Sequence, residues 1–183
     1  MTSAPSACAT TASRWAFCCP FWSALVPLAG QVGDLLDERQ RRLVEAAIAE
    51  LARVDFAALP TTLIHADLTG GNVLLGPDGA ITVLDFALAN RWPRLQELAV
   101  IAASLLHGSP DALPARMDTV ARLYSAAGPK PLTPAEKAAV PAVGRAAAAM
   151  ELLGGLNQWR QGNRGHETDL LISIGTTGLR DYG

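Results

Sequence analysis

A turn sequence between two apolar runs is the feature that most constrains the fold of this chain. Gly76-Pro77-Asp78-Gly79 carries proline and glycine at positions where type I turns favour them. The runs on either side, Val73-Leu74-Leu75 and Ile81-Thr82-Val83-Leu84, are short and rich in residues typical of strands. Residues 73–84 are therefore predicted to form a β-hairpin. Thr61–Ile64 is a further short run that favours a strand.

Most of the remaining chain is predicted to be helical, because alanine, the strongest helix former, occurs 33 times. Thr133-Pro134-Ala135-Glu136 has the sequence of a capping box with proline at the first helical position, which marks the start of a helix. That helix is expected to kink near Pro141 and to be interrupted at Gly154-Gly155. Further helices are expected at residues 93–108, beginning at Pro93, and at residues 111–127 and 167–180. The expected class is α+β and mainly helical.

The chain is predicted to form one domain behind an unpatterned N-terminal segment. Its 183 residues are 50% hydrophobic and 17% charged, which suffices for one sizeable core. Residues 1–33 show neither helical nor strand periodicity and form the segment, while residues 34–183 form the domain. Asp34 is the expected N-cap of the first helix, whose apolar face comprises Leu36, Leu43, Ala47, Leu51 and Val54.

Composition excludes several classes of partner. The formal net charge is −2 and no run of basic residues exceeds Arg41-Arg42, so the chain lacks the basic surface of a nucleic-acid-binding protein. The apolar stretch from Trp15 to Ala29 is too short to cross a membrane and contains two prolines. Three cysteines without zinc-ligand spacing are expected to be reduced thiols of a cytoplasmic protein: Cys8, Cys18 and Cys19.

Three oxygen-bearing side chains are predicted to meet at the open end of the hairpin. With a turn centred on Pro77-Asp78, the numbers of paired residues sum to about 155–157, which places Asp85 opposite residues 70–72. Asn72 lies in that stretch, and Asp67 precedes it in the same loop. Two carboxylates and one amide beside two glycines form a hard, oxygen-only site that suits Mg²⁺ and phosphate rather than zinc.

The same segment resembles a family of kinases. The run His65-Ala66-Asp67-Leu68-Thr69-Gly70-Gly71-Asn72 fits the catalytic-loop pattern H-x-D-L-x-x-x-N, and Asp85-Phe86-Ala87 is similar to the metal-binding D-F-G motif. The segment is still more similar to the aminoglycoside phosphotransferase family, the small-molecule branch of the protein-kinase-like fold. Pro93–Ala99 also resembles the helix that follows the metal motif in that family. The resemblance covers residues 60–107 and implies a kinase-like C-lobe whose hairpin carries both motifs.

The resemblance implies a role for each residue of the motifs. Asp67 would accept or orient the proton of the substrate hydroxyl, while Asn72 and Asp85 would hold Mg²⁺ against the phosphates of ATP. His65 would be a structural part of the loop. The chain departs from the usual residues of the family, glycine, histidine and glycine, at three positions: Ala66, Thr69 and Ala87.

Purely structural roles stay open for the same side chains. Asp67 also suits a turn or a cap, Asn72 a left-handed turn, and Asp85 an N-cap. Glu97 is expected to pack and to form structural hydrogen bonds. Acidic residues late in the chain either attract a cationic acceptor, such as an aminoglycoside or choline, or form a solvated helix surface: Glu151, Glu167, Asp169 and Asp181.

The N-lobe of a kinase has no counterpart in the sequence pattern. No lysine precedes Lys130 and no glycine-rich loop precedes His65, so the lysine that orients the nucleotide in a kinase is missing upstream. The chain is therefore expected to correspond to a C-lobe alone. The face left bare by the missing lobe is expected to favour association with another polypeptide.

Three hypotheses about function follow. The first is an ATP- and Mg²⁺-dependent phosphotransferase that acts on a small-molecule hydroxyl, with the nucleotide and that molecule as its partners. The second is a catalytically inactive C-lobe fragment or binding module. The third is a metal-dependent hydrolase built on His65 and Asp67. It needs a second ligand cluster, and His107 and His166 lie in unmatched sequence contexts.

Overall fold

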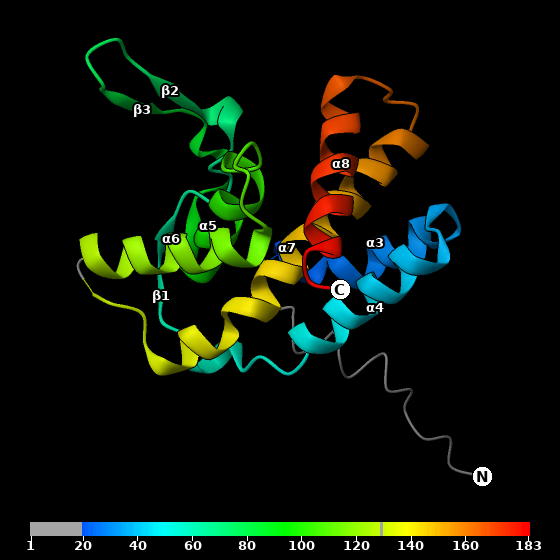
Figure 1. The fold of residues 1–183 in the computed structure, drawn as a ribbon, viewed down its shortest axis with the longest axis horizontal. Coiled ribbons are helices and arrows are strands. Elements are labelled where there is room, and N and C mark those ends of the chain that lie inside the picture. Colours follow the sequence, from blue (N-terminus) through cyan, green and yellow to red (C-terminus); the bar gives the residue numbers. More distant parts are fainter. Residues whose placement is uncertain (1–19, 129) are drawn as a thin grey trace.

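The computed structural model describes residues 20–128 and 130–183. They form a mainly helical body from which one β-hairpin projects (Figure 1). The helices are α2 (Pro20–Ser23), α3 (Leu25–Val32), α4 (Glu38–Leu51), α5 (Leu95–Val100), α6 (Leu113–Ala127), α7 (Pro134–Arg160) and α8 (His166–Arg180). The strands are β1 (Thr61–Ile64), β2 (Val73–Leu75), β3 (Ile81–Val83) and β4 (Asn90–Pro93). Short 3₁₀ helices lie at Gly33–Leu35, Phe56–Ala58, Gly70–Asn72 and Phe86–Leu88, and α5 continues into a π-helical turn at Ile101–Leu105.

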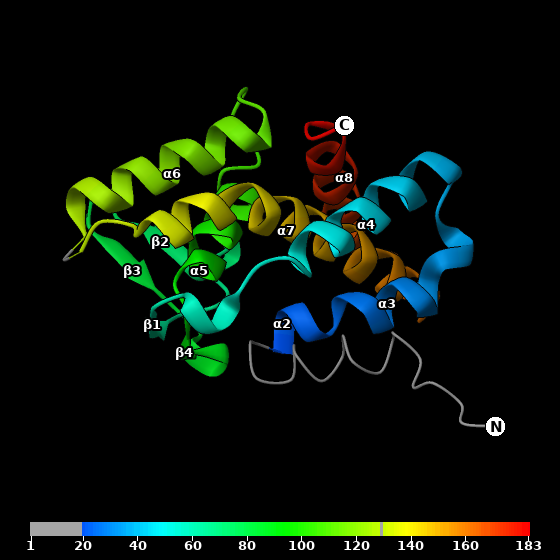
Figure 2. The same ribbon diagram turned by 90° about the horizontal axis from the view of Figure 1, so that it is seen from below.

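Helix α7 forms the centre of the core. It contacts α3, α4, α5, α6 and α8, and two perpendicular views show these helices around it (Figures 1 and 2). Its run Ala146–Ala149 is buried, and such small side chains let neighbouring helices approach closely. Gly175 of α8 shows how closely, because a Cβ atom there would collide with the backbone of Leu152. The alanine run is therefore a helix-packing surface.

Helix α7 begins where the sequence predicts and runs further than expected. Thr133 Oγ1 accepts a hydrogen bond from Glu136 N (3.2 Å), and Glu136 Oε2 accepts one from Thr133 N (2.8 Å), which completes the capping box. The predicted interruption at Gly154-Gly155 is wrong, because the helix continues through both glycines. A Cβ atom at Gly155 would collide with Ile172 of α8. Close packing between the two helices therefore stabilises α7 where the helix propensity of its residues is low.

Length and composition would allow α7 to cross a membrane. However, 67% of its most apolar window is buried inside the fold. A helix that is covered by five neighbouring helices is typical of the core of a globular domain, so its apolar character is explained by its central position.

Two helices precede the predicted start of the domain. α2 and α3 lie within residues 20–33, and Trp22, Leu25 and Val32 are buried in the core. The prediction that this stretch has no regular pattern is therefore wrong. The helices are short and Pro27 lies within the second, so tertiary contacts rather than local periodicity stabilise them: α3 packs against α7, and α2 packs against α3. The earlier part of the predicted segment, with the three cysteines, lies outside the described residues.

Helix α4 begins later than predicted. Its N-cap is Asp37, whose Oδ1 accepts from Gln40 N (2.7 Å) while Gln40 Oε1 accepts from Asp37 N (3.0 Å). Asp34 belongs to the preceding 3₁₀ turn and forms an ion pair with Arg160 at the end of α7. The prediction that Asp34 is the cap is wrong, because a reciprocal capping box satisfies two backbone groups and a single cap satisfies one.

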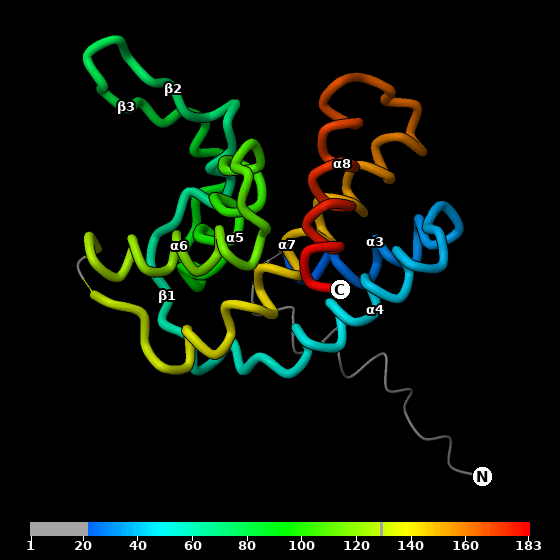
Figure 3. The backbone as a smooth tube through the Cα atoms, viewed as in Figure 1, coloured from blue at the N-terminus to red at the C-terminus, as the bar shows by residue number. Residues whose placement is uncertain are grey.

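The β2–β3 hairpin has the register that its turn predicts. Val73 pairs with Val83, and Leu75 pairs with Ile81. The two strands mainly contact each other and the adjacent 3₁₀ turn at Gly70–Asn72. The tube in Figure 3 shows the hairpin projecting away from the helical body. An isolated pair of strands is marginally stable in water, so this hairpin depends on what anchors its open end.

A second sheet brings together the residues before and after the hairpin. Strand β1 pairs antiparallel with β4, with Thr61 opposite Pro93 and Ile64 opposite Asn90. The prediction that Pro93 begins a helix is wrong, because this residue ends β4 and α5 begins at Leu95. The partner strand is distant in sequence, so the local pattern does not reveal the pairing.

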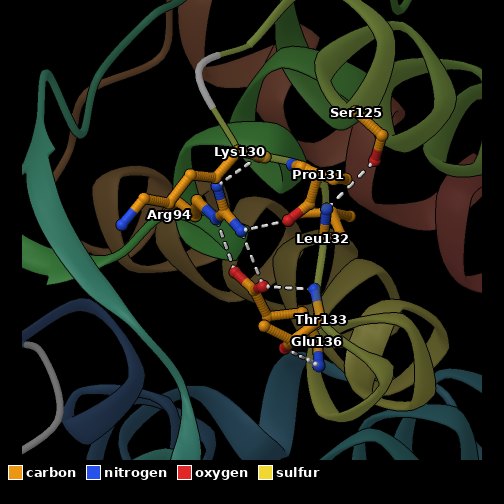
Figure 4. A network of polar contacts seen from close by, with 7 residues as sticks. All are labelled: Arg94, Ser125, Lys130, Pro131, Leu132, Thr133 and Glu136. Atoms are coloured by element: carbon orange, nitrogen blue, oxygen red, sulfur yellow. Dashed lines mark hydrogen bonds and ion pairs between the residues drawn. The ribbon is translucent and has the colours of Figure 1, made fainter.

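Arg94 joins the end of β4 to the start of α7 (Figure 4). Its guanidinium donates to both carboxylate oxygens of Glu136 at 2.6 and 2.8 Å, and to the carbonyls of Lys130 (2.8 Å) and Pro131 (2.9 Å). Burial acts to raise the pKa of Glu136, but hydrogen bonds from Arg94 and Thr133 outweigh it and hold this pKa below its ordinary value. The network fixes α5, which follows Arg94 directly, against α7.

Candidate active site

His65 connects the loop between β1 and the hairpin to the hairpin itself. The side chain is 7% exposed. Its Nε2–H donates to the carbonyl of Leu84 (2.7 Å), and its Nδ1 accepts a longer hydrogen bond from Asp67 N (3.3 Å). The Phe86 ring packs edge-on against the imidazole, with 4.7 Å between ring centroids. Because both ring nitrogens are engaged, His65 is suited to holding the loop and not to transferring a proton.

Asp67 and Asn72 lie in direct contact within this loop. The Asn72 Nδ2 group donates to Asp67 Oδ2 and to the Asp67 carbonyl, both at 2.9 Å. These bonds use the nitrogen of the amide and leave Asn72 Oδ1 free of hydrogen bonds from the described residues. They also hold one oxygen of the Asp67 carboxylate in place, and this side chain is only partly buried. The loop therefore presents an oriented carboxylate beside a free amide oxygen.

Asp85 lies one residue beyond the backbone hydrogen bond from Leu84 N to the Asn72 carbonyl (2.9 Å). Its φ of 56° is in the left-handed region, which aspartate tolerates better than most residues. Its Oδ1 accepts from Ala87 N (3.2 Å), so Asp85 is the N-cap of Phe86–Leu88, the structural role that the sequence left open. The residue is exposed, and its Oδ2 has no hydrogen bond from the described residues. The hairpin thus brings Asp85 beside Asn72 through the backbone, without a side-chain hydrogen bond between them.

Ala66 and Glu97 determine the path of the loop. Ala66 has a φ of 70°, a left-handed conformation that strongly favours glycine, which is the usual residue of the family at this position. Its N–H donates to Glu97 Oε2 of α5 (2.7 Å). Burial raises the pKa of Glu97 although this hydrogen bond opposes the shift, and the Glu97 Oε1 atom is buried without a partner. Glu97 therefore has the expected structural role, because it accepts a hydrogen bond from the backbone of the loop.

Glu151 is a partly buried carboxylate in the middle of α7. Burial and the negative charge of Asp67 raise its pKa to about 7, although a hydrogen bond with Ser104 opposes the shift. In the sequence, Glu151 is one of four acidic residues late in the chain. No local pattern separates it from the others, because its environment depends on the packing of α7 against distant parts of the chain.

The free oxygens at the loop fit a magnesium ion with bound phosphate. Asn72 Oδ1 and Asp85 Oδ2 can both serve as hard oxygen ligands, with water and phosphate as the others. A Cβ atom at Gly70 or Gly71 would meet no neighbouring atom, so there is open space beside the loop. Among the described residues, no three His, Cys, Asp or Glu side chains are grouped to hold a metal ion. The hydrolase hypothesis, which needs such a cluster, gains no support.

Sequence comparison agrees with the geometry of this loop. The profile of the phosphotransferase enzyme family, APH, matches residues 19–134, more than half of the chain. The chain belongs to this family. It is also 32% identical over 133 residues to a homoserine kinase from Methylobacillus flagellatus, a match that covers 72% of this chain and 41% of that kinase.

The fold is similar to that of a solved kinase. Against the ethanolamine kinase of Plasmodium vivax the TM-score is 0.55 at 13% identity, and the match covers 99% of this chain and 50% of that one. At this identity the likeness concerns the fold alone. The chain spans about half the length of the proteins it matches, which agrees with the C-lobe portion of a kinase-like fold. The predicted fold class, mainly helical with a small hairpin, is confirmed.

Proposed function

We propose that this protein takes part in the ATP- and Mg²⁺-dependent transfer of a phosphoryl group to a hydroxyl of a small molecule. The observation that carries the proposal is the contact between Asp67 and Asn72, with Asp85 delivered beside them by the hairpin, in a chain of the phosphotransferase family. Phosphoryl transfer depends mainly on positioning and on neutralisation of oxygen charge, and these side chains are suited to both.

Each residue of the loop has a definite task in this reaction. Asp67 accepts or orients the proton of the acceptor hydroxyl, and the hydrogen bond from Asn72 keeps its carboxylate in a single orientation. Asn72 Oδ1 and Asp85 Oδ2 would hold Mg²⁺, which when bound neutralises charge on the phosphate oxygens. His65 and Glu97 hold the backbone of the loop from two sides.

The proposed acceptor is a small amino alcohol. The names of the two similar kinases, homoserine kinase and ethanolamine kinase, each specify a molecule with both a hydroxyl and an amino group. For the present chain this acceptor class is part of the proposal.

The test incubates the chain with Mg-ATP and either ethanolamine or homoserine. The formation of the phosphate ester is measured by ³¹P NMR. No lysine precedes Lys130, so we expect the chain alone to turn over below the ordinary kinase range of ~1–100 s⁻¹, and long incubations are needed. Replacement Asp67→Asn should lower the rate by about 10²–10⁴-fold. The control Asp78→Asn, at the tip of the hairpin, should leave the rate unchanged. Equal rates in the two variants would contradict the role of Asp67.

Two observations favour a second function. No lysine precedes Lys130 in this chain, and the matches cover only 41% and 50% of the two similar kinases. In this alternative the chain is an inactive C-lobe or binding module that binds nucleotide or metal without turnover. Calorimetry with Mg-ATP separates the two: Mg²⁺-dependent binding without any ester supports the binding module. If the chain neither binds Mg-ATP nor forms the ester, both functions are contradicted. Loss of Mg²⁺ affinity in Asp85→Asn, which keeps the Asx turn but not the charge, would support the proposed metal site.

The hairpin carries an apolar surface that we propose is covered by the part of the kinase fold that this chain does not span. Large apolar side chains are exposed on β1, on both hairpin strands and on the turn that follows. We call this set the hairpin surface: Leu63, Leu74, Leu75, Ile81, Leu84, Phe86 and Leu88. The surface lies beside the catalytic loop, and the chain covers 50% of the similar ethanolamine kinase. A second lobe, on the same or another polypeptide, would remove these apolar side chains from water.

A further inference from the structure

A groove lies between the end of α4, the 3₁₀ turn at Phe56–Ala58 and the first half of α7. Its volume is about 370 Å³, near the lower end of the range found for ligand pockets. Most of its wall is apolar and is formed by Val54, Ala58, Leu59, Ala139, Pro141 and Ala142. The lining includes no residue of the candidate active site, so the groove is a separate feature of the molecule.

Three charged side chains also line the groove: Glu50, Arg53 and Asp55. Glu50 Oε1 accepts a hydrogen bond from Arg145 (2.8 Å), and Asp55 Oδ1 accepts one from Ala57 N (3.2 Å). The second oxygen of each carboxylate accepts no hydrogen bond from the described residues. The Arg53 guanidinium forms neither an ion pair nor a hydrogen bond with the described part of the chain. The groove therefore presents one uncommitted cation and two uncommitted carboxylate oxygens.

Pro141 adds a further polar group on the α7 side of the groove. Proline has no N–H, so the carbonyl of Lys137, one turn earlier in α7, does not receive its usual helical hydrogen bond. An apolar carboxylic acid would pair with Arg53 but would satisfy none of these oxygen acceptors. An apolar amine would do the reverse. A ligand that matches the whole lining carries both charges and an apolar body.

We propose that the groove binds a free α-amino acid with an apolar side chain. The carboxylate of the ligand pairs with Arg53, and its ammonium group donates to the free oxygens of Asp55 and Glu50. Its side chain lies against the apolar wall, where Leu59 and Ala139 are each only 6% exposed. The site is additional to the phosphotransfer site, and its existence does not depend on the proposed function.

The experiment is a titration of the ¹⁵N-labelled whole chain with L-leucine, followed by two-dimensional NMR at neutral pH. Saturable shifts should be concentrated on the amides of residues 50–59 and 135–142. Three analogues each lack one feature of leucine: 4-methylpentanoate lacks the ammonium group, 3-methylbutan-1-amine lacks the carboxylate, and glycine lacks the apolar side chain. Each analogue should bind about tenfold more weakly than leucine or worse, because each leaves part of the lining unmatched.

Two variants test the charged residues separately. Arg53→Gln should lower the affinity for leucine about tenfold and leave that for 3-methylbutan-1-amine unchanged. Asp55→Asn keeps an oxygen for the hydrogen bond from Ala57 and should reduce the preference for leucine over 4-methylpentanoate. The matched control Arg39→Gln replaces an exposed arginine of α4 outside the groove and should keep the full affinity.

The outcomes separate this inference from the proposed function. The amino-acid site is overturned by the absence of saturable shifts at these amides, by analogues that bind as tightly as leucine, or by equal affinities in Arg53→Gln and Arg39→Gln. Leucine binding that requires Arg53 and persists in Asp67→Asn supports a site separate from the phosphotransfer loop. Ester formation without leucine binding would support the proposed function and overturn the amino-acid site.

Discussion

Ala66 occupies a position where the backbone favours glycine. Its φ of 70° is maintained by the hydrogen bond from its N–H to Glu97, and the next residue is Asp67. A left-handed residue with a Cβ atom costs about 1–2 kcal/mol, while glycine loses about 0.5–1 kcal/mol through its greater freedom in the unfolded chain. The strain is thus located beside the proposed catalytic carboxylate.

Replacement Ala66→Gly should raise the free energy of unfolding by about 0.5–1 kcal/mol, because the relief of strain exceeds the entropic cost. Urea denaturation measures the change. The control Ala80→Gly is exposed and has no positive φ, so it should lower stability or leave it unchanged. A loss of stability in Ala66→Gly would show that the loop has a different conformation.

Glu151 should make stability dependent on pH. Its pKa of about 7 lies above the ordinary value of 4.5, so the folded state binds the proton more tightly than the unfolded state. Stability is then greatest below pH 4.5 and falls as pH rises towards 7, by on the order of 3 kcal/mol. Glu151→Gln should be more stable than wild type at pH 8, with a smaller difference at pH 5, in urea denaturation. A difference that does not change with pH would contradict the assigned environment.

At the scale of elements, the Arg94–Glu136 pair connects β4 and α5 to the start of α7. The pair is buried, and the same carboxylate completes the capping box of α7. The position of α5 matters for function because α5 carries Glu97, which supports the loop. One ion pair therefore links the stability of the core to the geometry of the candidate site.

Replacement Glu136→Ala should lower the free energy of unfolding by about 3–5 kcal/mol, since it leaves a buried guanidinium without its partner. The matched control Glu38→Ala breaks the exposed pair with Arg42 and should cost ~1 kcal/mol or less. The pKa of Glu136 is lowered, so its contribution is present above the ordinary pKa of glutamate and is lost as pH falls through the folded value. Equal effects of the two replacements in urea denaturation would contradict the structural role of Glu136.

At the scale of the whole molecule, the hairpin surface is apolar but lies outside the packed core. Leu75 and Ile81 pair across the two strands and are 74% and 68% exposed. The core around α7 is complete without them. The chain therefore combines a packed helical body with a site whose surroundings are open on one side.

The chain alone is expected to associate through the hairpin surface, because exposed apolar patches of this kind are otherwise rare on monomers. The double replacement Leu75→Asp and Ile81→Asp should shift sedimentation velocity profiles towards the monomer. Leu123→Asp, an exposed leucine of α6 outside the hairpin surface, is the control and should have no effect. Association that is unchanged in the double variant would show that another surface is responsible.

Local sequence predicts those features of the fold that depend on neighbouring residues. The hairpin register follows from one turn, and the start of α7 follows from one capping box. The register also brings Asp85 to the loop of Asn72, which is the main part of the candidate site. These predictions succeed because the determining interactions span only a few residues.

The other features were decided by tertiary contacts. The local pattern indicates an interruption at Gly154-Gly155, a helix starting at Pro93 and no regular structure in residues 20–33, and the packing of distant segments overrules each of these predictions. The shifted pKa of Glu151 has the same origin, because it reflects burial in the packed molecule. By itself the sequence determined the hairpin and the family, since the residues that specify them lie in one short stretch. Only the tertiary structure decided which distant side chains surround that stretch, because burial and charge are properties of the packed molecule.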